Sequence, residues 1–370
     1  MPTDITLTDL PDLARGAALL GTGGGGDPYI GLLLVSEELR RGKTITLLAP
    51  DEIADEDLVV ASAFMGAPTV VVEKIPSGDE PVTALRTLEN RLGRRADAII
   101  PMECGGLNSM IPLLVAARAG IPIIDGDGMG RAFPELQMET FGVYGVSGSP
   151  IAICDSNGHT TVIDTGADNK QMEWLARGVT IRMGGVSYIA EYPMTGAEVK
   201  RTAIPGTMSL ALALGRCIRE AREQHRDPFE ALGAACEQSI YGYGRVLLEG
   251  KVIDIERQST DGFVRGTATV SSFDGSVEVV LTFQNEHLVA HHNGRVLAIV
   301  PDLISVLDAQ TATPITTESL HYGHRVKIFA MSTPSIMRSP EALAVFGPQA
   351  FGLHDAWTPV EALAPVGSES

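Results

Sequence analysis

The sequence predicts an α/β protein in which the first half builds a mainly parallel sheet and the last third is mostly antiparallel β-structure. Two observations lead to this prediction. Helical patterns alternate with short apolar runs in the first half, which is the element order of βαβ units. Residues 251–300 instead alternate β-branched and polar side chains between the turn dipeptides Asp261-Gly262, Asp274-Gly275 and Asn293-Gly294, as in an antiparallel meander.

The chain length favours two domains, because 370 residues is long for a single core. We place an α/β domain at residues 1–165 and a mainly β domain with inserted helices at 166–370. The helices expected at 207–239 fit either part, so the predicted boundary lies between residues 165 and 240.

The elements of the first part follow from periodicity. Amphipathic helical patterns and short apolar runs alternate, which predicts helices at 9–20, 28–41 and 80–93 and strands at 44–49 and 58–64. Apolar runs at 98–100 and 121–124 flank a helical pattern at 107–119 that ends at Gly120, so this segment reads as a βαβ unit. Ligands gather at the carboxyl ends of parallel strands, where Glu103-Cys104 and Asp125-Asp127 would emerge into one crevice.

The middle of the chain carries a hairpin and further helices. Residues 151–164 resemble a hairpin that turns at Ser156-Asn157-Gly158, because β-branched runs flank a turn sequence. Helical patterns follow at 168–177, 207–225 and 228–239.

Charge and cysteine usage exclude several classes of function. The net charge of -18 leaves no basic block to meet phosphates, which excludes nucleic acid and anionic membrane surfaces as partners. Four scattered cysteines without a CxxC pair favour a reducing compartment. The polar N-terminus is unlike a signal peptide and no apolar run is long enough to span a bilayer, so we expect a cytoplasmic protein that acts on a small molecule.

A glycine loop at residues 20–28 contains the pattern GxGxxG. A dinucleotide fingerprint requires a preceding strand, whereas residues 10–20 have helical periodicity, so we do not expect NAD or FAD. The amides of Gly23, Gly24 and Gly25 could form a nest for an anion or a carbonyl oxygen of the substrate. The alternative is a tight turn that packs two helices together.

Cys104 is a candidate nucleophile. It lies just before the helix expected at Leu107, where free amides and the helix dipole favour a thiolate. Glu103 could serve as the base and Asn108 as an amide that orients a carbonyl group. The alternative for Cys104 is a buried packing residue at a strand end.

Asp125 and Asp127 are candidate catalytic bases or metal ligands, since two carboxylates beside glycines permit close approach of a ligand. Arg131 could bind a substrate carboxylate or pair with one of these aspartates. A structural Asx turn is the alternative. His159, in the predicted hairpin turn, could complete a divalent metal site with Asp125 and Asp127, so the need for a metal stays open.

Two other regions contain residue types that often bind ligands. The histidine groups at 287–292 and 321–324 have spacings that split across the two faces of a strand, so they do not predict a zinc site. Lys200 lies between the two predicted parts of the chain, where ligand sites are frequent, and is a candidate substrate-binding or charge-stabilising residue.

Five motifs in order give the chain a family resemblance. They are LGTGGGGDP, ECGGLNS, DGDGMGRAFPE, YPMTGAEVKR and FGPQAFGLHDAWTPVE, and the long DGDGMGRAFPE is the most specific. With them the whole chain resembles the S-methyl thiohydantoin desulfurase-like family. The resemblance implies an N-terminal three-layer α/β/α domain and a C-terminal barrel-like β domain.

The same resemblance implies a chemistry and partners. The implied reaction is hydrolysis at a hydantoin-like ring, with attack by water or Cys104 on C2 of an S-methyl thiohydantoin and release of methanethiol. The implied partners are a homo-oligomer or proteins of the hydantoinase and oxoprolinase type. The alternative function is a small-molecule-binding or accessory subunit of such a system, which binds without reacting.

Overall fold

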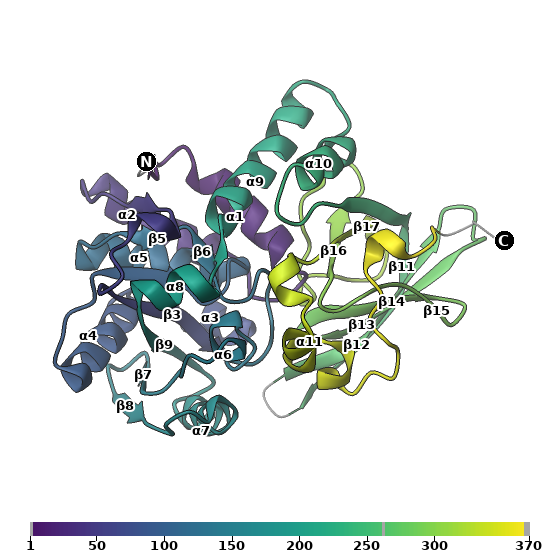
Figure 1. The fold of residues 1–370 in the computed structure, drawn as a ribbon. Coiled ribbons are helices and arrows are strands. Elements are labelled where there is room, and N and C mark those ends of the chain that lie inside the picture. Colours follow the sequence, from purple (N-terminus) through teal and green to yellow (C-terminus); the bar gives the residue numbers. More distant parts are fainter. Residues whose placement is uncertain (1–2, 261–262, 366–370) are drawn as a thin grey trace.

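The chain folds into a helix-covered sheet followed by a second, curved sheet, as Figure 1 shows for this computed structural model. The structure describes residues 3–260 and 263–365. The predicted turn at Asp261-Gly262 lies outside these residues. No helix in the described ranges combines the length and the apolar character needed to cross a membrane.

The first sheet has eight strands in the order β1-β2-β5-β4-β3-β9-β7-β8. Its four central neighbours are parallel, namely β2 (Thr46–Leu48), β5 (Ile123–Ile124), β4 (Ala98–Pro101) and β3 (Leu58–Gly66). Antiparallel strands flank them, namely β1 (Thr3–Asp4), β9 (Val186–Thr195), β7 (Ile151–Cys154) and β8 (Thr160–Ile163). The sheet is therefore mixed, with a parallel centre.

Helices cover both faces of this sheet, which gives the predicted three layers (Figure 1). One face carries α4 (Glu80–Leu92) and α5 (Met110–Ala119), and the other carries α7 (Asn169–Arg182) and α8 (Gly196–Thr202). The central strands β3 and β4 are buried almost throughout, as expected for parallel strands between two helical layers.

Seven antiparallel strands form the second sheet, a half-barrel in the order β15-β14-β13-β12-β11-β17-β16. They are β11 (Gly244–Thr260), β12 (Phe263–Ser272), β13 (Glu278–Gln284), β14 (Glu286–His292), β15 (Arg295–Ile299), β16 (Leu303–Asp308) and β17 (Arg325–Met331). The antiparallel meander expected at 251–300 is confirmed by the ladders from β11 to β15.

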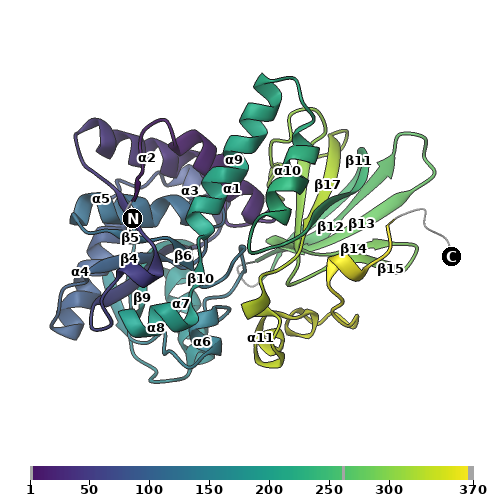
Figure 2. The same ribbon diagram turned by 45° about the horizontal axis from the view of Figure 1, so that its top comes forward.

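A helical pair connects the two sheets. The helix α9 (Thr207–Glu223) packs on α1 (Leu10–Leu20), and α10 (Pro228–Glu237) packs on β11, as Figure 2 shows from above. The remaining helices are α2 (Tyr29–Arg40), α3 (Pro68–Glu73), α6 (Thr140–Val143) and α11 (Pro340–Phe346), and a short ladder joins β6 (Gly126–Asp127) to β10 (Ile204–Pro205).

Candidate functional site

A small cavity of about 40 Å³ lies where the carboxyl ends of β3 and β4 meet the start of β14. Its walls come from the glycine loop, both strand ends, the segment after residue 132, α7 and the turn before β14. The lining residues are Gly25, Phe64, Met65, Gly66, Met102, Glu103, Asn108, Phe133, Pro134, Glu135, Leu136, Arg177, Asn285 and Glu286. Of the residues expected to emerge into one crevice, Glu103 lines this cavity, whereas Cys104, Asp125 and Asp127 do not.

Glu103 lies two residues beyond β4 and its side chain is buried. Asn108 Nδ2 donates to its Oε1 at 2.7 Å, and the Phe133 amide donates to its Oε2 at 3.2 Å. The amide of Phe64 donates to Asn108 Oδ1 at 2.7 Å, which turns the Asn108 amino group toward Glu103. Burial and the nearby charge of Glu286 raise the pKa of Glu103 well above its usual value.

Glu286 begins β14 and faces the same cavity from the second sheet. The side chain is buried, and among the described residues its Oε2 has no hydrogen-bond partner. Burial raises the pKa of Glu286 to about 8, while the charge of Arg131 acts in the opposite direction. The cavity therefore brings together two carboxyl groups with raised pKa values.

The glycine loop holds Glu286. A Cβ at Gly24 would lie 2.0 Å from Glu286 Oε1, so this close approach requires glycine at position 24. The amide of Gly25 donates a hydrogen bond to Glu286. Gly23 turns its carbonyl to Thr317, whose amide and hydroxyl donate to it at 2.8 and 3.1 Å. The predicted nest at Gly23, Gly24 and Gly25 thus contacts a carboxyl group of the chain itself.

Asp125 and Asp127 hold backbone segments in place, and neither lines the cavity. Asp127 accepts hydrogen bonds from the amides of Cys104 at 2.6 Å and Gly130 at 3.0 Å, and burial raises its pKa to about 7. Asp125 accepts from the amide of Ser209 at 3.0 Å, at the first turn of α9. Asp127 therefore holds the loop that carries Glu103, and it contributes to the site by positioning that residue.

The predicted role of Cys104 as nucleophile is not supported by its position. Its Sγ lies 3.3 Å from the carbonyl oxygen of Thr207 and 3.3 Å from Met208 Sδ, inside a hydrophobic cluster. Burial and the charge of Asp127 raise the pKa of this thiol well above its usual value. The helix also begins at Met110, after a 3-10 turn, so the expected dipole is displaced from the sulfur.

Arg131 is fully buried and is not positioned to bind a substrate carboxylate. Its guanidinium donates to the carbonyl oxygens of Asp302 and His287 and to Thr22 Oγ1, each at 2.8 Å. Two of these partners belong to the second sheet region and one to the glycine loop. Arg131 therefore joins the two parts of the chain around the cavity.

Lys200 and His159 also have other partners. Lys200 Nζ lies 2.6 Å from Asp55 Oδ1, and His159 Nδ1 lies 3.0 Å from Asp155 Oδ2 in the turn between β7 and β8. Within residues 3–260 and 263–365, no group of three or more His, Cys, Asp or Glu side chains is arranged to hold a metal ion. Asp125, Asp127 and His159, the candidate metal ligands, each contact a different partner in the fold.

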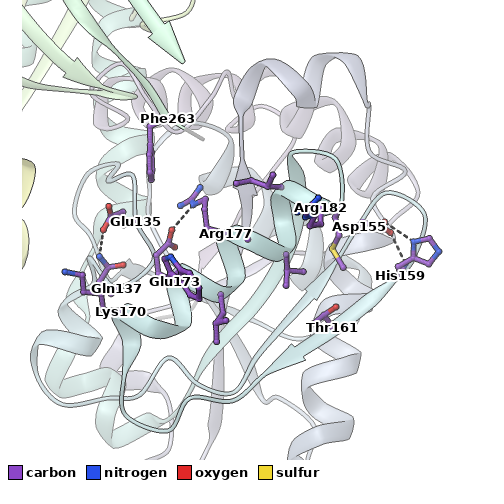
Figure 3. A pocket seen from close by; sticks show the side chains of 16 residues that line it. Glu135, Gln137, Asp155, His159, Thr161, Lys170, Glu173, Arg177, Arg182 and Phe263 are labelled. Atoms are coloured by element: carbon purple, nitrogen blue, oxygen red, sulfur yellow. Dashed lines mark hydrogen bonds and ion pairs between the residues drawn. The ribbon is translucent and has the colours of Figure 1, made fainter. Parts of the chain in front are cut away.

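A larger cleft of about 1010 Å³ runs along α7 (Figure 3), and it shares two lining residues with the small cavity. Both are lined by Glu135 and Arg177. Arg177 donates from Nε to Glu173 Oε1 at 2.7 Å and from Nη2 to the Pro134 carbonyl at 2.9 Å, and it lies 4.8 Å from the Phe263 ring. Where the cleft and the cavity meet, one wall thus comes from α7 and the other from the start of β12.

A second buried acid pair lies nearby, outside the cavity lining. Among the described residues, neither carboxylate oxygen of Glu139 or of Glu191 has a hydrogen-bond partner, and both side chains are fully buried. Burial raises the pKa values of both well above the usual range. Next to Glu191, β9 has a register shift between the residues that pair with Val59 and Ala61, and Tyr192 has a positive φ of 44°.

Sequence reasoning missed Glu286, Glu139, Glu191 and the cleft along α7. The signal for Glu286 was an acid at the start of an apolar strand, which the neighbouring histidines obscured. For the cleft, the i,i+4 pair of Glu173 and Arg177 was readable on the predicted helix. Helix α7 also continues to Arg182, beyond the predicted end at residue 177.

Comparison with known proteins gives a consistent match along the chain. The family model described as "S-Me-THD-like, N-terminal domain" matches residues 8–165, and "S-Me-THD-like, C-terminal domain" matches residues 167–360. A crystal structure of a structural-genomics protein from Chromobacterium violaceum has the same fold, with a TM-score of 0.81 and 23% sequence identity over 97% of this chain and 100% of that one. No curated protein matches the sequence.

Proposed function

Because the chain belongs to the S-Me-THD-like family, we propose that it hydrolyses an S-methyl thiohydantoin and releases methanethiol. The observation that carries this proposal is the pair Glu103 and Glu286, which face one small cavity with raised pKa values. Paired carboxyl groups whose proton affinities are tuned by burial are suited to general acid and base catalysis near neutral pH.

The cavity suits a reacting water molecule. A water needs a minimum of roughly 10–15 Å³ and two to four polar partners. The volume of about 40 Å³ meets this minimum, and both glutamates supply partners. The thiohydantoin ring is too large for this space, so it would enter from the adjoining cleft and present its C2 atom at the junction beside Glu135 and Arg177.

Glu286 is assigned as the general acid. Its pKa of about 8 keeps it protonated at neutral pH, so it can donate a proton to the ring nitrogen as water adds to C2. Burial is the main cause of the raised pKa of Glu103, and protonation of Glu286 removes the charge that raises this pKa further. Glu103 accepts two hydrogen bonds in a fixed orientation, which act against the larger effect of burial on its pKa, and is assigned as the general base toward the water.

The reaction balances without a redox partner. The water oxygen bonds to C2 and becomes the new carbonyl oxygen, and the bond between C2 and sulfur breaks. Glu103 takes one proton from the water and passes it to the departing thiolate. The second water proton leaves the C2 hydroxyl as the carbonyl forms and replaces the proton that Glu286 gave to the ring nitrogen. The products are a hydantoin and methanethiol, and each glutamate returns to its starting protonation state.

The test is thiol release from a synthetic S-methyl thiohydantoin, measured with a colorimetric thiol reagent and by NMR of the hydantoin. We expect Glu103→Gln and Glu286→Gln each to lower kcat by about 10²–10⁴-fold. The matched control is Glu80→Gln, a buried carboxyl group on α4 that accepts from Ser77 and Gly78 and should leave turnover unchanged.

The dependence of turnover on pH tests the role of Glu286 separately. Turnover that requires protonated Glu286 should fall above about pH 8, and this decline should disappear from any residual rate of Glu286→Gln. Thiol release that is unaffected by both glutamine variants would refute the assignment. Ligand binding without any turnover across a panel of thiohydantoins would support the accessory-subunit alternative instead.

A further inference from the structure

The cleft along α7 contains a glycine that the fold itself does not require. Gly178 lies inside the helix Asn169–Arg182 and lines the cleft. A Cβ built at this position would meet nothing within 4 Å, and its φ is in the ordinary helical range. Glycine inside a helix destabilises it by roughly 0.5–1 kcal/mol relative to alanine, so the cost of Gly178 has no packing explanation.

Several side chains around Gly178 are apolar and partly exposed, and they lie beside charged groups such as Arg177 and Arg182. One helical turn before it lies Trp174, with 69% of its surface exposed, and one turn after it lies Ile181, with 52% exposed. Val179 from α7, Met183 directly after it and Phe263 from β12 line the same cleft. Large apolar side chains exposed in a concave surface are typical of a ligand site.

The cleft and the proposed reaction site meet at shared residues. Glu135 and Arg177 line both the cleft and the cavity that holds Glu103 and Glu286, and Arg177 directly precedes Gly178. Figure 3 shows Phe263, Arg177 and Glu135 close together at one end of the cleft. A ring bound at the junction would therefore direct its substituent along α7.

From this arrangement we infer that the substrate carries a large apolar substituent on its ring, and that Gly178 determines specificity by leaving room for it. This inference rests on the proposed function for the identity of the ring. We expect this substituent, for example a benzyl group at ring C5, to occupy the cleft along α7. Because Gly178 has no side chain, the substituent can lie against the helix backbone between Trp174 and Ile181.

The experiment compares two S-methyl thiohydantoins, one with methyl and one with benzyl at C5. We expect the native protein to prefer the benzyl compound in kcat/KM by at least about tenfold, since apolar pockets discriminate substituents to this degree. Gly178→Leu should reduce this ratio at least about fivefold through KM, and Gly178→Ala should reduce it less. Gly178→Ala should at the same time raise Tm, which separates lost space from lost stability.

Ala213→Leu is the matched control, because it adds bulk at an exposed position inside another helix, α9. It should leave the benzyl-to-methyl ratio unchanged. A native protein without preference, or a ratio that Gly178→Leu does not change, would overturn the inference while leaving the proposed hydrolysis intact.

A binding experiment distinguishes failure of the inference from failure of the proposed function. The products 5-methylhydantoin and 5-benzylhydantoin are titrated while tryptophan emission is recorded, with Trp174→Phe identifying the signal of that side chain. Tighter binding of the benzyl product, weakened by Gly178→Leu, supports the inference even if no thiol is released. A change in molecular mass in light scattering upon Gly178→Leu, with no effect on hydantoin binding, would instead identify the cleft as an interface between copies and overturn the inference.

Discussion

Gly24 and Glu286 come from opposite parts of the chain and touch so closely that a Cβ at residue 24 would lie 2.0 Å from the Glu286 carboxylate. Adding a methyl group should therefore displace Glu286 from the cavity. We expect Gly24→Ala to destabilise the fold by about 1–3 kcal/mol and to lower turnover more than tenfold.

Thermal unfolding and thiol release would be measured on the same preparation of Gly24→Ala. Gly178→Ala provides the comparison for stability, since a Cβ at that position meets no atom within 4 Å. Native stability and native turnover in Gly24→Ala would show that the contact has no consequence for the site.

The buried acids predict how stability depends on pH. The pKa values of Asp127, Glu286 and Asp302 are raised to about 7, 8 and 7, whereas an unfolded chain releases these protons near pH 4. Their contribution to stability is fully present below about pH 4 and is lost as the pH rises through 7 to 8. His287, with its pKa lowered to about 4, contributes in the opposite sense, above about pH 6.5.

Because the acids outnumber this histidine, we expect Tm to fall by about 5 °C or more between pH 6 and pH 8.5. Glu191→Gln should flatten this decline, since it removes a buried carboxyl group whose oxygens have no partner among the described residues. Glu223→Gln, on the exposed surface of α9, should leave the slope unchanged. A Tm that rises over this pH range would contradict the raised pKa values.

Arg131 should be essential for stability. Its replacement by Met leaves the carbonyl oxygens of Asp302 and His287 buried without their donor. Hydrogen bonds from a charged group each contribute roughly 1.5–3 kcal/mol, so Arg131→Met should lower the free energy of unfolding by about 3 kcal/mol or more. Chemical denaturation measures this loss.

Arg131→Lys separates charge from geometry, because lysine keeps the charge but cannot reproduce the planar set of donors. We expect it to recover less than half of the stability lost in Arg131→Met. Full recovery would mean that charge alone accounts for the role of Arg131.

Cys104 should be dispensable for chemistry. Its sulfur packs against Met208 and the Thr207 carbonyl, so Cys104→Ser should keep thiol-releasing activity within about threefold of native. In the folded protein the thiol should also react slowly with alkylating agents, because it is buried and its pKa is raised. Loss of activity in Cys104→Ser with unchanged Tm would restore the nucleophile hypothesis.

Much of the fold could be predicted because its signals are local. The periodicity at residues 80–93 and the stop at Gly120 correspond to the ends of α4 and α5 within a few residues. Glu103 was expected at the carboxyl end of a parallel strand, and it does follow the end of β4. What failed was the assignment of partners: Asp127 and Arg131 looked like ligands in a polar loop, but the tertiary structure surrounds them with backbone donors and acceptors.

Glu286 shows why the remainder could not be predicted. The position of Glu286 depends on a contact with Gly24, which lies far away in the sequence. The residues around position 286 give no local signal for that contact. The raised pKa values likewise arise from burial, which is a property of the packed structure.

The meeting of Glu103 with Glu286 has a consequence for biosynthesis. A ribosome adds the strands of the first sheet, which end at Thr195, well before it adds the residue that begins β14. Until then the nascent chain holds one member of the pair and lacks the other. If the pair carries the reaction, every truncated translation product that ends before residue 286 is inert, and activity first arises when the late strand joins the earlier part of the protein.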